Sequence, residues 1–265
     1  KQGPFELWQE AGWLQVAKMV QEDIDAGKAL CNAPLPAWVF EGPVAQAGGV
    51  HTAQCSWNAA EKKFVARRVL PVYEKQLFPE KLLGEDSLPD WKTAGTTLFE
   101  NKALRAWTLD DQVVIASIKN KMHAISPEVM ESLMEAIELA ENEYQGMVIW
   151  SGDAPFSVGA DLEATMPAFV VGGADAIDSI EGELQNLMMR LRYAQVPVVS
   201  AIHGMALGGG CELAVYSARR VAHMESYIGL VEVGVGLVPG AGGLTYIARR
   251  AAENVAASTS KDIVP

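Results

Sequence analysis

Three glycine-bearing segments hold the residues that could do chemistry in this sequence. They are FSVGADL (156–162), GMALGGGCE (204–212) and VEVGVGLVPGAGG (231–243), and each follows an apolar run typical of a strand. Glycine at a strand-to-helix junction lets a ligand approach the backbone closely, and it leaves unpaired N–H donors at the helix N-terminus. Such donors bind anions and developing oxyanions. One segment alone fits a tight turn equally well, but three together favour a binding site.

Two glycine-rich nucleotide motifs do not fit these segments. A dinucleotide-binding unit needs GxGxxG, followed about 20 residues later by an acid that binds the ribose, and no segment meets both conditions. A Walker loop needs a lysine before its Ser or Thr, and GLVPGAGGLT (236–245) lacks that lysine. We therefore expect a different class of ligand.

Composition excludes several further classes of function. The 265 residues carry a net charge of −12, so the clustered cations of a nucleic-acid interface are not expected. Cys31, Cys55 and Cys211 lie far apart without the spacing of a metal site, which favours a reducing compartment. The longest apolar run, 196–215, contains His203 and Glu212 and is a poor membrane helix. We predict a cytoplasmic protein with no metal site, no nucleic-acid partner and no membrane span.

From about residue 100, the elements that must position the glycine segments alternate in type. Ser126, Pro127 and Glu128 supply an N-cap, a proline at the first helical position and an acid in the first turn. Strand and helix patterns in alternation predict an α/β fold with right-handed crossovers. The predicted strands are 112–118, 147–150 and 196–202, and the predicted helices are 127 to about 142 and about 180–193. In the first of these helices, the residues expected to form a buried stripe are Val129, Leu133, Ile137 and Ala140.

The first hundred residues have a different character. Residues 1–60 contain four of the seven tryptophans and no long β-branched run. Apolar residues from Phe5 to Val20 recur at helical spacing, and Gly27 can end that helix. Prolines, charges and turn residues fill the following stretch. We predict a helical segment over 1–60, a linker over 61–100 and an α/β domain over 101–265.

The runs SGDAPFSVGADL, VPVVSAIHGMALGGGCELA and IGLVEVGVGLVPGAGG resemble, in order and spacing, the enoyl-CoA hydratase/isomerase (crotonase) family. The run VVIASI followed by KMHAISPEVMESL is similar to the start of that domain. The resemblance implies a crotonase-like α/β fold, with a repeated β-β-α core from about residue 101. It also implies hydration of 2-enoyl-CoA to 3-hydroxyacyl-CoA in fatty-acid β-oxidation. Family sequences continue beyond Pro265, so we expect a domain truncated at its C-terminus.

The resemblance also implies roles for particular residues. The backbone N–H groups of Ala160 and Gly209 would bind the thioester oxygen as it becomes an oxyanion. Glu212 would be the base that activates water, and Glu232 the acid that protonates the α-carbon. A non-catalytic interpretation remains open for each acid: Glu212 could complement the dipole of its own helix, and Glu232 could be a solvated loop acid. His203 is expected to be structural.

Coenzyme A would lie along the GADL run, with Lys121 and Met122 near its phosphates and pantetheine. Family members often carry a lysine shortly after GAD, where this sequence has Glu163 and Ala164. That departure weakens the electrostatic argument for binding the nucleotide. The residues expected to contact coenzyme A are Lys121, Met122, Ala160, Asp161, Leu162 and Gly208.

The runs GPFELWQEAGW (3–13) and APLPAWV (33–39) resemble the last helices of the 3-hydroxyacyl-CoA dehydrogenase C-terminal domain. This implies a fused dehydrogenase/hydratase, in which NAD serves only the part that precedes this chain. We therefore expect no cofactor here beyond the coenzyme A of the acyl-CoA substrate, and a possible homo-oligomer. The alternatives are an enoyl-CoA isomerase of the same fold, and a CoA-binding or assembly module with little catalysis.

Overall fold

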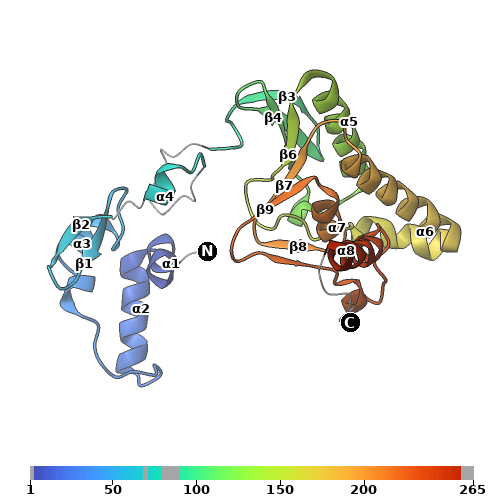
Figure 1. Ribbon diagram of the computed structural model, residues 1–265. Coiled ribbons are helices and arrows are strands. Elements are labelled where there is room, and N and C mark those ends of the chain that lie inside the picture. The colour runs from blue at the N-terminus through green and yellow to red at the C-terminus, as the bar shows by residue number, and fades with distance from the viewer. Residues whose placement is uncertain (1–2, 68–70, 79–89, 258–265) are drawn as a thin grey trace. The chain divides into compact units, whose positions relative to one another are not determined.

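The computed structural model describes residues 3–67, 71–78 and 90–257. The chain divides into two compact units, Lys1–Lys92 and Thr93–Pro265 (Figure 1). Two stretches of the predicted linker, 68–70 and 79–89, lie outside the described residues. The end of the chain from residue 258 onward lies outside them as well. Each unit has its own buried apolar core.

The first unit packs around tryptophan side chains. Trp13 is 2% exposed, and its indole Nε1–H donates to the Val39 carbonyl at 2.8 Å. Trp8, Trp38 and Trp57 are partly buried against the same cluster. The elements are α1 (Pro4–Glu10), α2 (Trp13–Asp25), η1 (Ala37–Val39), α3 (Pro43–Ala47), the antiparallel hairpin β1 (Cys55–Asn58) and β2 (Lys63–Ala66), and α4 (Pro71–Glu74).

The single helix predicted from Phe5 to Val20 is wrong. The chain breaks at Gly12, whose φ of 100° lies outside the helical region, and α2 starts at the next residue. The break turns α2 so that Trp13 and Ala17 are buried. The apolar spacing in the sequence continues through this break and therefore does not reveal it.

The second unit is built on a six-stranded sheet in the order β3-β4-β5-β6-β7-β9 (Figure 1). The first three strands pair antiparallel, and β5, β6, β7 and β9 pair parallel. Strand β3 lies inside the predicted linker, so the sheet begins before residue 101. The strands are β3 (Thr96–Glu100), β4 (Leu104–Thr108), β5 (Val113–Ile118), β6 (Gly146–Ile149), β7 (Val198–Ile202) and β9 (Arg219–Ala222); β8 (Met205–Leu207) and β10 (Tyr227–Gly229) form a separate parallel pair.

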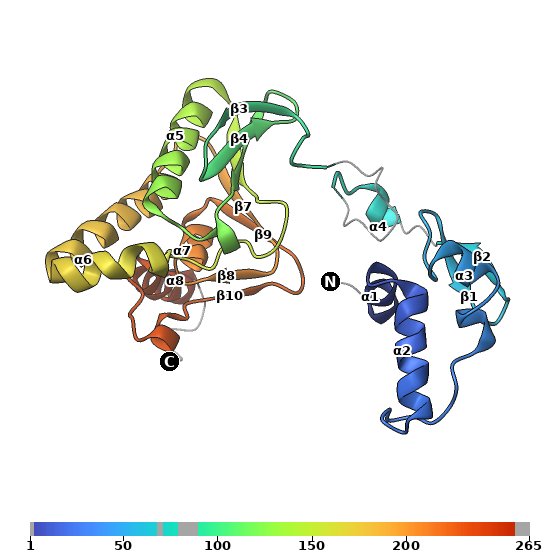
Figure 2. The same ribbon diagram turned by 180° about the vertical axis from the view of Figure 1, so that it is seen from behind.

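Helix α5 (Pro127–Glu143) packs on β4, β5 and β6 and lies beside α6 (Leu162–Arg192) (Figures 1 and 2). The Ser126 hydroxyl accepts the Val129 N–H, as expected of an N-cap. A bidentate pair between Arg190 and Glu141 links the two helices. The prediction of the buried stripe is confirmed, since Val129, Leu133, Ile137 and Ala140 are each 0% exposed.

Helix α6 starts 18 residues before the predicted helix. Asp161 caps it by accepting the Ala164 N–H at 3.1 Å. Pro167 and Gly173 interrupt the helical pattern of the sequence, and the chain is non-helical at Gly173, with φ 60° and ψ −144°. Helices α7 (Gly209–Tyr216) and α8 (Gly243–Ala257) and the short turns η2 (Lys121–His123) and η3 (Glu232–Val235) complete the unit.

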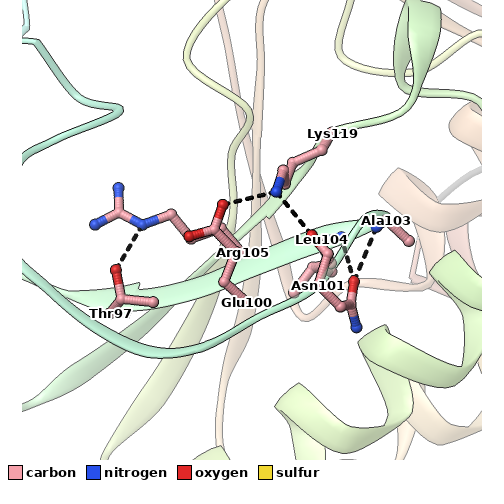
Figure 3. A network of polar contacts seen from close by, with 7 residues as sticks. All are labelled: Thr97, Glu100, Asn101, Ala103, Leu104, Arg105 and Lys119. Carbon is pink, nitrogen blue, oxygen red and sulfur yellow. Dashed lines mark hydrogen bonds and ion pairs between the residues drawn. The ribbon is translucent and has the colours of Figure 1, made fainter.

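A polar network fixes the end of β5, from which the chain leads into η2 (Figure 3). Lys119 Nζ donates to Glu100 Oε1 and to the Asn101 carbonyl, both at 2.7 Å. The Asn101 side-chain oxygen accepts two backbone N–H groups of residues 103–104, each at 2.9 Å. Its amide nitrogen donates to Ser132 of α5 at 2.9 Å. The β3–β4 turn, β5 and α5 are thereby held together.

Candidate active site

The Ala160 N–H is left free by the way its segment pairs with the chain beside it. Ile125 N–H donates to the Gly159 carbonyl at 2.8 Å, and Asp161 N–H donates to the Ile125 carbonyl at 3.0 Å. Because successive N–H groups of extended chain point in opposite directions, the Ala160 N–H points away from Ile125. It donates to no acceptor among the residues that the structure describes.

The three glycines 208–210 lie beside the segment that carries this N–H, and each has its own reason to be glycine. Gly208 has a φ of 53°, in the left-handed region. A Cβ at Gly210 would lie 2.5 Å from the Ser157 carbonyl oxygen. A Cβ at Gly209 would lie 3.4 Å from the Ala160 nitrogen. The Gly209 N–H, at the start of α7, also lacks an acceptor within the described part of the chain, so two free donors lie close together.

Glu212 is a buried acid one turn further along α7. Its side chain is 2% exposed, and its Oε1 accepts the Gly243 N–H at 2.8 Å. Burial raises the pKa of Glu212 to about 7, and the negative charges of Glu232 and Glu181 add to this, against the N–H groups of Gly243 and Ala241. The carboxylate bonds to the 240–243 loop rather than to its own helix N-terminus. Near neutral pH it can hold or release a proton.

Glu232 begins η3 and brings a second carboxylate to the glycines. Its Oε1 would lie 3.3 Å from a Cβ placed on Gly208. Its Oε2 is buried and has no hydrogen-bond partner among the described residues. Leaving a buried acceptor unpaired costs about 1–3 kcal/mol. This oxygen is therefore not that of a solvated loop acid, and it is available to a water or a substrate atom.

Glu181 of α6 is a third acid here, and the sequence interpretation missed it. Its Oε2 is also buried without a partner among the described residues. Burial raises its pKa, and the charge of Glu232 raises it further. One signal was available: Glu181 lies three residues before buried Leu184 and seven before buried Met188, on the apolar side of the helix.

The loop 240–243, which contacts Glu181 and Glu212, is fixed by side chains of two helices. Gln185 Nε2 donates to the Gly240 carbonyl at 2.7 Å, and the Tyr216 hydroxyl donates to the Gly242 carbonyl at 3.0 Å. A Cβ on Gly240 would lie 2.5 Å from Cδ of Glu181. The N–H groups that the loop presents to Glu212 are thus held in position.

The residues expected to bind coenzyme A are only partly brought together. The Met122 carbonyl accepts the Val158 N–H at 3.3 Å, so η2 lies beside the segment that carries Ala160. Met122 has a φ of 58° and is 43% exposed, and Lys121 is exposed on the same turn. Asp161 caps α6 instead of pointing a free carboxylate at a ligand, and Leu162 is the first residue of that helix.

Other potentially reactive side chains do not belong to this group of N–H donors and glutamates. The His203 ring packs edge-on against His223, with 5.2 Å between centroids. Burial raises the pKa of the Cys211 thiol to about 11, so it is neutral and a poor nucleophile. Within residues 3–67, 71–78 and 90–257, no three His, Cys, Asp or Glu side chains are grouped to hold a metal ion. None of the helices in those ranges is both long and apolar enough to cross a membrane.

Comparisons with known proteins agree on one family. A family model described as enoyl-CoA hydratase/isomerase matches residues 111–260. A probable 3-hydroxyacyl-CoA dehydrogenase of Bacillus subtilis (strain 168) is 30% identical over 242 residues, which are 91% of this chain and 28% of that protein. A peroxisomal bifunctional enzyme of Cavia porcellus is 38% identical over 130 residues, or 48% of this chain and 17% of that enzyme.

A solved enoyl-CoA hydratase from Polaromonas sp. JS666 superposes with a TM-score of 0.52 and 28% identity. The match covers 56% of this chain and 58% of the hydratase chain. The present chain spans at most 28% of the length of the two curated relatives described above.

Proposed function

This chain belongs to the enoyl-CoA hydratase/isomerase family, and from that premise we propose that it adds water to a 2-enoyl-CoA to form the 3-hydroxyacyl-CoA. Its second unit has the crotonase-like α/β fold of the solved hydratases. One observation carries the proposal: two free backbone N–H groups lie beside the buried carboxyl group of Glu212 and the half-buried one of Glu232, whose Oε2 is buried. The first pair suits a thioester oxygen, and the second suits proton transfer to and from water.

The Ala160 and Gly209 N–H groups stabilise the charge that develops on the substrate. The thioester oxygen accepts both donors, which draws electrons from the C2=C3 double bond and makes C3 electrophilic. As the hydroxyl adds, the oxygen becomes an enolate oxyanion. Removing one such donor typically costs about 2.7–4 kcal/mol of transition-state stabilisation.

The carboxylates of Glu212 and Glu232 transfer the protons. Ionised Glu212 removes a proton from the attacking water, whose oxygen bonds to C3. Protonated Glu232 gives its proton to C2, which returns the enolate to a thioester. A pKa of about 7 at Glu212 suits a group that must both gain and lose a proton near neutrality. Because the acids interact, their titration steps belong to the cluster.

Coenzyme A would bind along η2 and the start of α6. Met122, the Ala160–Leu162 backbone and Gly208 would line the pantetheine and adenine, and exposed Lys121 would meet a phosphate. Glu163, in the first turn of α6, opposes that charge. The proximity of η2 to the Ala160 segment supports this placement.

We further propose that the parent protein is a fused β-oxidation enzyme. Relatives named 3-hydroxyacyl-CoA dehydrogenase and bifunctional enzyme support this, as does the match of the Bacillus subtilis relative to 91% of the chain. NAD would serve the dehydrogenase part alone. A cytoplasmic location fits the free thiols Cys31, Cys55 and Cys211, and assembly into homo-oligomers is part of the same proposal.

The test is turnover of crotonyl-CoA by the full-length parent, followed as loss of the absorbance of the conjugated enoyl thioester. Glu212→Gln and Glu232→Gln should each lower kcat about 10²- to 10⁴-fold. Glu135→Gln, on the exposed side of α5, is the matched control. Wild-type rates in both active-site variants would refute the mechanism.

The same assay separates the alternatives. An isomerase would convert a 3-enoyl-CoA to the 2-enoyl-CoA without forming a 3-hydroxyacyl product. A binding or assembly module would retain acyl-CoA in a filtration assay and turn over neither substrate. Two carboxylates beside the donor pair favour hydration, because moving a double bond requires only one.

A further inference from the structure

Glu181 and Glu232 share a feature that the hydration mechanism does not explain. Each has a buried Oε2 without a hydrogen-bond partner among the described residues. Glu181 reaches the 240–243 loop from α6, next to Gly240, while Glu212 reaches the same loop from α7 and bonds Gly243. Glu232 approaches from η3, beside Gly208. Two carboxyl groups from two helices therefore contact one loop, and the negative charge of Glu232 acts on both of them.

The titratable groups that interact by charge within this cluster are the three glutamates and the thiol of Cys211. From α7 come Glu212 and the thiol of Cys211, whose pKa the charges of Glu212 and Glu232 raise. Glu183, on α6 itself, is exposed.

From α7, the Tyr216 hydroxyl meets the loop at the Gly242 carbonyl. From α8, the cations Arg249 and Arg250 pair with Glu253 instead. No ion pair within residues 3–67, 71–78 and 90–257 includes any of the three clustered glutamates.

Neighbouring carboxylates that have no cation beside them repel one another, and this repulsion favours protonation of one of them. A third carboxylate increases the repulsion that the last ionisation must overcome, whereas protonation of one member relieves it. A protonated carboxyl also offers an O–H donor to a neighbouring unpaired oxygen.

We propose that Glu181 is a positioning residue that keeps one proton in the Glu212–Glu232 pair at pH values where the pair alone would lose it. This inference rests on the proposed function, since hydration needs one acid protonated while the other is ionised. Glu181 touches no reacting atom in this role. It acts through the two catalytic acids by its charge.

The kinetic test compares Glu181→Gln with Glu183→Gln in the full-length protein. The last proton to leave the wild-type cluster departs against two negative charges, and in Glu181→Gln against one. The alkaline limb of the kcat/KM profile should therefore move down by about one pH unit. The acid limb should move down as well, because the charge of Glu181 also raises the pKa of Glu212 in the wild-type protein. Glu183→Gln should leave both limbs unmoved, and Glu181→Asp should restore the alkaline limb.

A merely structural role for Glu181 would lower the rate at every pH without moving either limb. An unmoved alkaline limb in Glu181→Gln overturns the proposal, and so does an equal shift in Glu183→Gln.

A second measurement does not depend on turnover. In wild-type protein labelled with ¹³C at glutamate Cδ, the Glu181 resonance is assigned by its change in Glu181→Asp. It should titrate clearly above the ordinary glutamate value of about 4.3, with a second step where Glu212 titrates. A single step near the ordinary value overturns the inference, even if Glu181→Gln does not fold. If the coupled steps are seen but crotonyl-CoA is not hydrated, the proposed reaction fails and the proton-holding cluster remains.

Discussion

Replacing Gly209 by alanine should strongly reduce hydration while leaving the fold intact. The new Cβ would lie 3.4 Å from the Ala160 nitrogen, 3.5 Å from Gly159 Cα and 3.6 Å from Ile125 Cδ1. The distances to carbon are ordinary van der Waals contacts, and the contact with nitrogen is at their lower limit, so the methyl group fits. Gly209 is helical and has no positive φ. Gly→Ala changes at compatible positions stabilise proteins by about 0.4–1 kcal/mol.

The same methyl group occupies the place that the substrate oxygen needs. An oxyanion must come within about 2.7–3.1 Å of each donor nitrogen. A carbon atom 3.4 Å from the Ala160 nitrogen would crowd an oxygen that approaches this nitrogen. Loss of one donor predicts a fall in kcat/KM of about 10²- to 10³-fold, or roughly 2.7–4 kcal/mol.

The assay pairs crotonyl-CoA turnover with thermal unfolding for Gly209→Ala and a control, Gly182→Ala. Nothing lies within 4 Å of a Cβ at helical Gly182, so the control should keep its activity and melt slightly higher. The reasoning is refuted if Gly209→Ala melts like the wild type and retains a kcat/KM within about tenfold of it, against the larger loss expected.

Two further predictions concern the acids and the loop. The folded pKa of Glu212, about 7, lies above the unfolded value of about 4.3, so its ionisation destabilises the fold as pH rises between those values. Glu212→Gln should therefore have a free energy of unfolding about 3 kcal/mol higher than wild type at pH 8. Denaturant titrations should show that this difference disappears below pH 4. A difference that stays constant with pH would contradict the raised pKa of Glu212. Tyr216→Phe removes the hydrogen bond to the Gly242 carbonyl, and this should lower the free energy of unfolding by about 1 kcal/mol. The substitution should also lower kcat more than it raises KM. An unchanged kcat would show that the 240–243 loop is held in place without this hydrogen bond.

The sequence predicted those features of the fold and the site that depend on short-range patterns. The apolar spacing of Val129 to Ala140 and the Ser126 cap define α5 without any tertiary information. The glycines 208–210 signalled a close backbone approach, and the structure assigns each a separate contact.

Features that depend on packing between distant segments were missed. Gly12 breaks a helix that apolar spacing alone would continue, and the Asp161 cap starts α6 before the residues that interrupt its pattern. Glu181 acquires its place only because α6 packs beside the 240–243 loop. No local pattern encodes that proximity, although an acid on an apolar helix face was a signal that could have been followed.

Both donors of the site are main-chain amides, held by segments that pair with each other through backbone atoms. Ser157 N–H donates to the Met205 carbonyl at 3.1 Å, and Leu207 N–H donates to the Ser157 carbonyl at 3.0 Å. Among the natural amino acids, only proline at residue 160 or 209 would delete a donor outright. Substitutions of the surrounding side chains, including the two acids to which we assign proton transfer, would therefore leave both donors in place. A fold arranged in this way can change its chemistry by few substitutions while it keeps the same pair of main-chain donors.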